Sequence, residues 1–370
     1  NLVLTGITTD VCVSTTMREA NDLGYECLLL SDCTAATDYG NYLATLKTTQ
    51  MGGGIIGCVA ATADLLQAIG EKVPDALAAA EMVDLGHGVT VRMPRPPPGA
   101  WMPRTMSEVV VAPKAPADGQ RGVAADPYVW PFDGKLMPEN TALLAINFQK
   151  DFLLATGGLP RAGHQLEGSA AVIKQTESVM KQMRAKGFHV LHARLGYAAN
   201  LGDCPKRAVQ HLPVGNCGPL GRCLIRGEEG WEFIPQLAPL PGEVVVEKTG
   251  YGAFHLTSLE LSLHSLGVRN LVLVGVPADV CVHTTMRQAN DRGFECLLLS
   301  DCIATTAADT YFSALKQVKM QHGVFGAVAA SEALLSVLAG FEDGPSKPIH
   351  RGVNDNDKGS HPDCKRLKSS

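Results

Sequence analysis

The chain has 370 residues, of which 45% are hydrophobic, and a formal net charge of −5 at pH 7. These values are typical of a globular protein with a sizeable core, and mild acidity without a dense basic stripe argues against nucleic acid as the main partner. No apolar run reaches the roughly 18 to 20 residues that cross a bilayer, and the eleven cysteines lack the spacing of a disulfide framework, so we expect a cytoplasmic protein without membrane association.

The chain opens with half of a repeated unit. The segment NLVLTGITTDVCVSTTMREANDLGYECLLLSDC begins at Asn1 and returns nearly unchanged as NLVLVGVPADVCVHTTMRQANDRGFECLLLSDC at Asn270. So long a period indicates duplication of a whole domain rather than a solenoid, whose repeats run roughly 20 to 50 residues. We interpret residues 1–70 as the C-terminal half of a first copy. Its open sheet edge predicts pairing, either with the second copy in the same chain or in a homo-oligomer.

The rest of the chain divides by composition. Residues 71–127 include the run RMPRPPPGAWMP and are expected to form a Pro-rich linker. Residues 128–341 form a complete copy. Residues 342–370 are polar and rich in Gly, Pro, Asp and Lys, and we expect a disordered tail there.

In the complete copy, short apolar runs alternate with longer helical patterns, which is typical of βαβ units. After the first run, Val172, Thr176, Val179 and Met183 recur on one helix face, and the helix is expected to end at Gly187. We predict an α/β fold with a doubly wound, mostly parallel sheet and helices on both faces, in three layers. Its six strands are expected at 143–147, 189–193, 244–248, 271–276, 296–300 and, with a weaker pattern, 324–328.

Three side chains lie where ligands bind in such sheets, at the carboxyl ends of strands. Cys281 is expected in the first turn of a helix whose N-cap is Asp279. Free amides at that position stabilise a thiolate and lower its pKa from about 8.5 toward neutrality. Lys248, at the end of another strand, would lower it further. Asn147 is the third side chain, and Cys12 is the equivalent of Cys281 in the first copy. A buried, inert thiol is the alternative interpretation of Cys281.

The complete copy resembles the isochorismatase-like cysteine hydrolase superfamily. The segment PYVWPFDGKL and the helix CVHTTMRQANDRG resemble its branch of biuret, triuret and ureidoacrylate amidohydrolases. The resemblance implies an Asp, Lys, Cys triad in which Cys281 is the nucleophile and Lys248 the lysine. It places Gln149 and Asp151 at the polar positions after the first strand, and Asn147 where the family has its aspartate.

Asn147 departs from the family pattern, because an amide cannot take the thiol proton or activate water as the family aspartate does. The resemblance also implies a cis peptide bond beside the oxyanion hole, at Val276–Pro277 and, in the first copy, at Ile7–Thr8. Proline has no N–H to donate, whereas Thr8 does. Losing one oxyanion donor typically costs about 10² to 10³ in rate. The complete copy is therefore expected to be impaired.

Four further residues are expected to contact the substrate: Gln149, Phe254, His283 and Gln321. No cofactor is indicated, because GxGxxG does not occur in a strand-turn-helix context. No metal site is indicated either, since His189 and His192 alternate with apolar residues, which favours core histidines. The long loop 196–231 is either a lid or an ordinary surface excursion.

These observations predict a cysteine hydrolase that cleaves a C–N bond of a small amide or ureido substrate through a thioester. A catalytically inactive copy that binds a ligand, or that supports an active upstream copy, is the alternative. A vinyl-ether hydrolase of the isochorismatase type is disfavoured, because that branch does without the nucleophilic cysteine.

Overall fold

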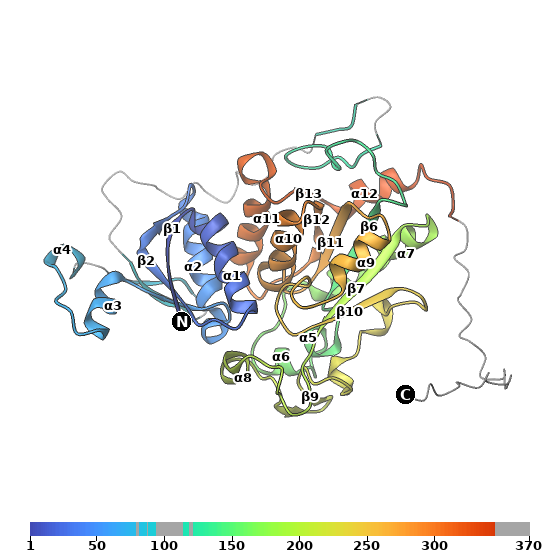
Figure 1. Ribbon diagram of the computed structural model, residues 1–370. Coiled ribbons are helices and arrows are strands. Elements are labelled where there is room, and N and C mark those ends of the chain that lie inside the picture. The colour runs from blue at the N-terminus through green and yellow to red at the C-terminus, as the bar shows by residue number, and fades with distance from the viewer. Residues whose placement is uncertain (79–80, 87, 94–113, 118–120, 345–370) are drawn as a thin grey trace, which may run out of the picture.

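The protein contains two parallel β-sheets, one in each copy (Figure 1). The computed structural model describes residues 1–78, 81–86, 88–93, 114–117 and 121–344. The larger sheet has the order β10-β7-β6-β11-β12-β13, and all neighbouring strands are parallel. The predicted α/β class and the six predicted strands are confirmed. The strands are β6 (Thr141–Ile146), β7 (His189–Leu195), β10 (Val244–Lys248), β11 (Asn270–Gly275), β12 (Glu295–Ile303) and β13 (Ala327–Ala329).

Strands β6 and β11 form the centre of this sheet, and every residue in both is buried. They pair in register from Asn270 opposite Thr141 to Gly275 opposite Ile146. The chain runs outward from β6 to β7 and β10, then returns to β11 and runs the other way. The topological switch point, where ligands bind in doubly wound sheets, therefore lies between the ends of β6 and β11.

Helices cover both faces of the sheet, as predicted for a three-layer domain. Val172, Val179 and Met183 of α7 (Ser169–Ala185) pack into one core together with α12 (Ser331–Leu338). The core on the other face receives side chains from α9 (Leu259–Ser265), α10 (His283–Asp291) and α11 (Ala308–Gly323). The shorter elements are α5 (Lys150–Leu153), α6 (Gly158–Arg161), α8 (Lys206–His211), β8 (Cys217–Gly218), β9 (Gly221–Arg222), η3 (Glu229–Trp231) and η4 (Pro235–Leu237).

The first copy has the second half of the same fold. Its sheet has the order β1-β2-β3, and its elements repeat the series from β11 to α12 of the complete copy. Among the described strands, β1 pairs only with β2, and Ile7 at its end is 74% exposed. The expected open edge is therefore present. The elements are β1 (Leu2–Ile7), η1 (Thr9–Val13), α1 (Ser14–Asp22), β2 (Cys27–Ala35), α2 (Tyr39–Gly54), β3 (Cys58–Ala60) and α3 (Thr62–Ala68).

The expected linker is in part ordered structure, which corrects the prediction for residues 75–78, 81–86 and 88–93. After the short helix α4 (Asp75–Ala78), strands β4 (Glu81–Asp84) and β5 (Thr90–Met93) form an antiparallel hairpin. Its alternating apolar residues Val89, Val91 and Met93 are buried in the core of the first copy, which explains why it packs there. Most of the Pro-rich run and most of the predicted tail lie outside the described residues.

The two copies associate through helices rather than through sheet edges. Helix α1 lies against α10, and α2 lies against α11 (Figure 1). Lys47 of α2, only 4% exposed, forms an ion pair of 2.5 Å with Asp309, and Lys316 of α11 pairs with Asp38. The sequence predicted that the first copy pairs either with the second copy of the same chain or with another chain. The structure shows the pairing within the chain.

Candidate active site

Cys281 lies in the turn η5 (Ala278–Val282), a single π-helical turn that connects β11 to α10. Such turns are frequent at functional sites. The predicted cap is wrong: Pro277 occupies the N-cap position, and no side chain caps this turn. Asp279 lies inside the turn instead, with one carboxylate oxygen unpaired among the described residues. Cys281 is 1% exposed and lines a small cavity.

Lys248, the last residue of β10, is 1% exposed and approaches Cys281. Its Nζ donates hydrogen bonds to the carbonyl oxygens of Gly250, at 3.1 Å, and Tyr251, at 3.0 Å. The Lys248 ammonium also lies close enough to the Cys281 thiol to lower its pKa. The structure therefore brings together the two residues that the sequence placed on separate strands.

Asn147 follows β6 with φ of 57°, a left-handed conformation that asparagine tolerates better than most residues. Its Nδ2 donates a hydrogen bond of 2.9 Å to the carbonyl of Val276, and its side chain acts to lower the pKa of the Cys281 thiol. Its Oδ1 has no hydrogen-bond partner among the described residues. Asn147 thus lies close enough to Cys281 to influence the thiol.

The environment of Cys281 corrects the expectation of a lowered thiol pKa. Burial raises the pKa of Cys281, and the opposing effects of the Lys248 ammonium and the Asn147 hydrogen bond do not cancel it. Asp22 of the first copy raises it further through its negative charge. Because the desolvation effect prevails, Cys281 rests as a thiol and becomes a thiolate only when another group takes its proton.

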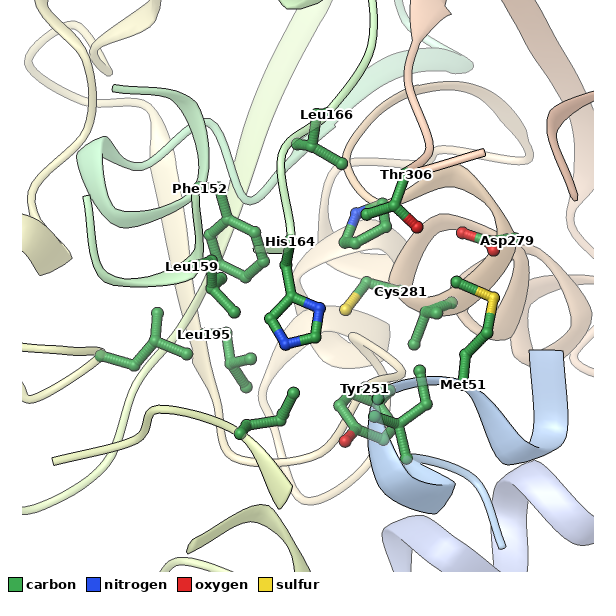
Figure 2. Close-up of a pocket in the computed structure, with 16 residues that line it drawn as sticks. Met51, Phe152, Leu159, His164, Leu166, Leu195, Tyr251, Asp279, Cys281 and Thr306 are labelled. Carbon is green, nitrogen blue, oxygen red and sulfur yellow. The ribbon is translucent and has the colours of Figure 1, made fainter. Parts of the chain in front are cut away.

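The cavity at Cys281 has a volume of ≈ 70 Å³ and lies between the two copies. Its wall is mostly apolar and includes Phe152, Leu159 and Leu195 from the complete copy and Met51 and Ile55 from the first copy (Figure 2). A space of this size holds several water-sized groups. The first copy therefore contributes directly to the site of the complete one, which the sequence did not indicate.

His164 also faces this cavity, from the loop after α6. Figure 2 shows its imidazole and the Cys281 sulfur pointing toward one another across the space. Burial lowers the pKa of His164, so its neutral form is favoured. His164 could not be identified from the sequence, because a lone histidine in the stretch RAGHQLEG carries no motif.

The four expected substrate contacts do not line the cavity. All three hydrogen bonds of the buried Gln149 side chain go to backbone groups of Leu195 and Trp231. Phe254 packs on Phe294, and His283 hydrogen-bonds to Arg287 and to the Ala314 carbonyl. Gln321 lies in the kink of α11 at φ of 50°.

At the position of Gln321, the first copy rather than the complete copy contributes the residue that lines the cavity. The equivalent of Gln321 in the first copy is Gly52, which does line the cavity of the complete copy. The first copy's Gly52, rather than Gln321 itself, therefore lies at this cavity.

Cys12 lies in η1, the equivalent turn of the first copy, and is exposed. The expected cis peptide bonds Ile7–Thr8 and Val276–Pro277 are both present.

His192, expected in the core, is fully buried, and its Nε2 shares a 2.9 Å hydrogen bond with Glu243. Across the described part of the chain, no cluster of three or more His, Cys, Asp or Glu side chains could hold a metal ion. In the same residues, no helix is both long and apolar enough to cross a membrane.

Comparison with known proteins identifies the family of this chain. A family model described as "Isochorismatase domain" matches residues 1–61 and 141–333, which is more than half of the chain and covers both copies. The chain belongs to the isochorismatase family. This confirms the resemblance stated from the sequence.

Curated relatives of this isochorismatase-family chain include ureidoacrylate amidohydrolases named RutB. The protein from Caulobacter segnis is 30% identical over 158 residues, covering 40% of this chain and 66% of that protein. The protein from Methylobacterium radiotolerans is 27% identical over 211 residues, covering 55% of this chain and 82% of that protein. Among solved structures, a cysteine hydrolase from Pseudomonas syringae is 23% identical, with a TM-score of 0.48, 55% of this chain covered and 94% of the other.

Proposed function

We propose that the protein is a cysteine hydrolase that cleaves a C–N bond of a small amide or ureido substrate through a thioester on Cys281. The observation that carries the proposal is the placement of the Cys281 thiol. It lies close enough to the Lys248 ammonium and the Asn147 amide for both to act on its pKa, and it lines a small cavity that His164 also lines. A nucleophile, a cation and a proton acceptor around one small space are what acyl transfer to sulfur requires.

In the first half-reaction, neutral His164 takes the proton of the Cys281 thiol, and Lys248 stabilises the thiolate that forms. The sulfur attacks the substrate carbonyl carbon and forms a C–S bond. The C–N bond then breaks, and the departing nitrogen takes its proton from the imidazolium of His164. A thioester and a neutral imidazole remain.

In the second half-reaction, a water molecule attacks the thioester and gives a proton to His164. The C–S bond breaks, the acid leaves, and the thiolate recovers its proton from the imidazolium. His164 thus performs the proton transfers for which Asn147 has no capacity, since an amide does not accept a proton near neutral pH. Asn147, which departs from the family pattern, retains an influence on the thiol, whose pKa it acts to lower.

The cavity restricts the substrate class. Its small volume and mostly apolar wall favour a compact, uncharged group at the reacting end, such as a carbamoyl or ureido nitrogen next to the carbonyl. The relatives named ureidoacrylate amidohydrolase make ureidoacrylate the first compound to assay, with simple primary amides beside it.

The test is release of ammonia from this panel by the full chain and by Cys281→Ala. Cys296→Ala is the matched control, because Cys296 is equally buried but lies in strand β12, away from the cavity. We expect turnover that Cys281→Ala abolishes and Cys296→Ala preserves. Binding of a panel compound without any ammonia release would instead support the inactive ligand-binding copy.

A further inference from the structure

The first copy reaches the site of the complete copy through Asp22, the last residue of α1. Asp22 is 8% exposed, and its carboxylate accepts hydrogen bonds from the backbone N–H groups of Tyr251, at 2.7 Å, and Gly252, at 2.9 Å. A third donor, Nε2 of Gln288, lies 3.3 Å from the same carboxylate. Both carboxylate oxygens act as acceptors. Burial raises the pKa of Asp22, and the hydrogen bonds from Gly252 and Tyr251 and the charge of Lys248 oppose that effect.

The same two peptide groups bind Lys248 on their other side. The peptide joining Gly250 and Tyr251 accepts from Lys248 Nζ at its carbonyl and donates to Asp22 at its N–H. The peptide joining Tyr251 and Gly252 does the same. Two peptide dipoles therefore run in parallel between the carboxylate and the ammonium, in the orientation that both charges favour, and each hydrogen bond polarises the next.

The loop 249–254 follows β10 and approaches the side chains of Asp22 and Gln288 very closely. At two of its positions, a side chain larger than that of glycine would force these neighbours to move. A Cβ on Gly250 would lie 2.9 Å from the Asp22 carboxyl carbon, and one on Gly252 would lie 2.1 Å from the Gln288 side-chain oxygen. The sequence KTGYG after β10 thus allows side chains of α1 and α10 to reach the backbone.

Four successive backbone N–H groups of this loop are held by side chains. Those of Tyr251 and Gly252 are held by Asp22, that of Ala253 by Thr285 and that of Phe254 by Gln288. Thr285 in turn donates to the carbonyl of Cys281. The first copy therefore supplies the half of this clamp that lies nearest to Lys248.

We infer that Asp22 is a positioning residue for the reaction of the complete copy: through two peptide groups it orients the Lys248 ammonium that stabilises the Cys281 thiolate. Asp22 does not line the cavity and touches neither substrate nor sulfur. This role rests on the proposed function. It gives the first copy a part in catalysis that does not depend on Cys12.

The test compares Asp22→Asn with Asp291→Asn in the full chain. Asp291 is the equivalent of Asp22 in the complete copy, at the end of α10, and it is exposed, so it is the matched control. In Asp22→Asn, one of the two oxygens that accept from the backbone is replaced by an NH₂ group. Because this group and the backbone N–H that it faces are both donors, at least one peptide of the loop should rotate away. We expect kcat to fall between about 10- and 100-fold, the cost of a small misplacement of a catalytic group. KM should change less than about twofold, because the cavity wall is intact.

Hydrogen exchange gives a second readout that needs no substrate. In Asp22→Asn, the Tyr251 and Gly252 amides should exchange at least about tenfold faster, whereas Asp291→Asn should leave them unchanged. Lys248→Met should also speed exchange at both amides. Their N–H groups bind Asp22 and not Lys248, but the carbonyls of the same two peptides bind Lys248, so losing the ammonium should loosen both peptides. This variant still tests the bridge if Asp22→Asn does not fold.

Unchanged exchange in Asp22→Asn, or faster exchange with unchanged kcat, would overturn the inference. An equal loss of kcat in Asp291→Asn would also overturn it. If the wild-type chain hydrolyses none of the compounds, the proposed function fails. The exchange data then still decide whether Asp22 holds the loop.

Discussion

Arg18 and Arg287 occupy equivalent positions in the two copies, and each binds the cysteine-bearing turn of the other copy. Arg18 donates to the carbonyls of Asp279 and Val280 and to the Thr284 hydroxyl. Arg287 forms the same three bonds with the equivalent groups of the first copy, namely the carbonyls of Asp10 and Val11 and the Thr15 hydroxyl. The interface is thus self-complementary, like that of a twofold dimer, although it forms within one chain.

The first prediction concerns this interface. Arg18→Met should lower the free energy of unfolding by about 2 to 4 kcal/mol, because two buried carbonyls lose their partner. It should also lower kcat, since the turn bearing Cys281 loses a support. Arg92→Met is the control: Arg92 is 30% exposed and pairs with the half-exposed Asp64, so a loss below about 1 kcal/mol is expected. Equal destabilisation by both changes, measured by urea unfolding, would contradict the interpretation.

The second prediction concerns His164. His164→Asn should lower kcat by about 10² to 10⁴, the usual contribution of a general base, with little effect on thermal unfolding. In the wild type, activity should fall as the pH drops through the pKa of His164, because only the neutral imidazole accepts a proton. Burial lowers that pKa, so the acid limb should lie below the ordinary value of about 6.5. An acid limb that persists unchanged in His164→Asn would assign it to another group.

The third prediction separates the roles of Asn147 and His164. Asn147→Asp places a carboxylate beside the Cys281 sulfur, where it can take over proton transfer. We expect Asn147→Asp to raise the kcat of the His164→Asn variant at least about tenfold. Steady-state kinetics of the two single variants and the double variant measure this coupling. No gain in the double variant would show that the amide at 147 is not what limits proton transfer.

The fourth prediction concerns stability in acid. Burial acts to raise the pKa of Glu243, but hydrogen bonds from His192 and Arg184 outweigh it and lower the pKa to about 2. A carboxyl with a lowered folded-state pKa stabilises the fold above its unfolded pKa of about 4.5 and loses this effect as the pH falls toward 2. The contribution is at most about 3 kcal/mol for a side chain that is 14% exposed.

Glu243→Gln should therefore be less stable than the wild type at pH 7. The difference should shrink as the pH is lowered from about 5 to about 2. Urea unfolding at several pH values measures it. A difference that does not change with pH would show that the loss comes from packing rather than from the charge.

The sequence was sufficient for features that depend on local pattern. The central strands could be predicted because apolar runs such as TALLAI and NLVLVG are buried on both faces, and Lys248 and Cys281 because they follow such runs directly. Their convergence follows from strand order, since the carboxyl ends of parallel strands share one edge. The buried helix face of Val172, Val179 and Met183 could also be predicted, because these residues recur with the period of a helix.

What could not be predicted depends on contacts between segments far apart in the chain. Met51 and Asp22 reach the site only because the first copy docks through its helices, which no local pattern encodes. His164 has no neighbours in sequence that distinguish it. The thiol pKa was predicted in the wrong direction, because the free amides of the turn and the lysine were considered without the full burial of Cys281.

The central claim is that Cys281 carries the acyl group of the substrate, and mass spectrometry after rapid acid quenching tests it most directly. During turnover, the peptide containing Cys281 should gain the mass of the acyl group, and the corresponding peptide of Cys281→Ala should not. Turnover by the wild type without any adduct on that peptide, together with undiminished turnover by Cys281→Ala, would contradict the account.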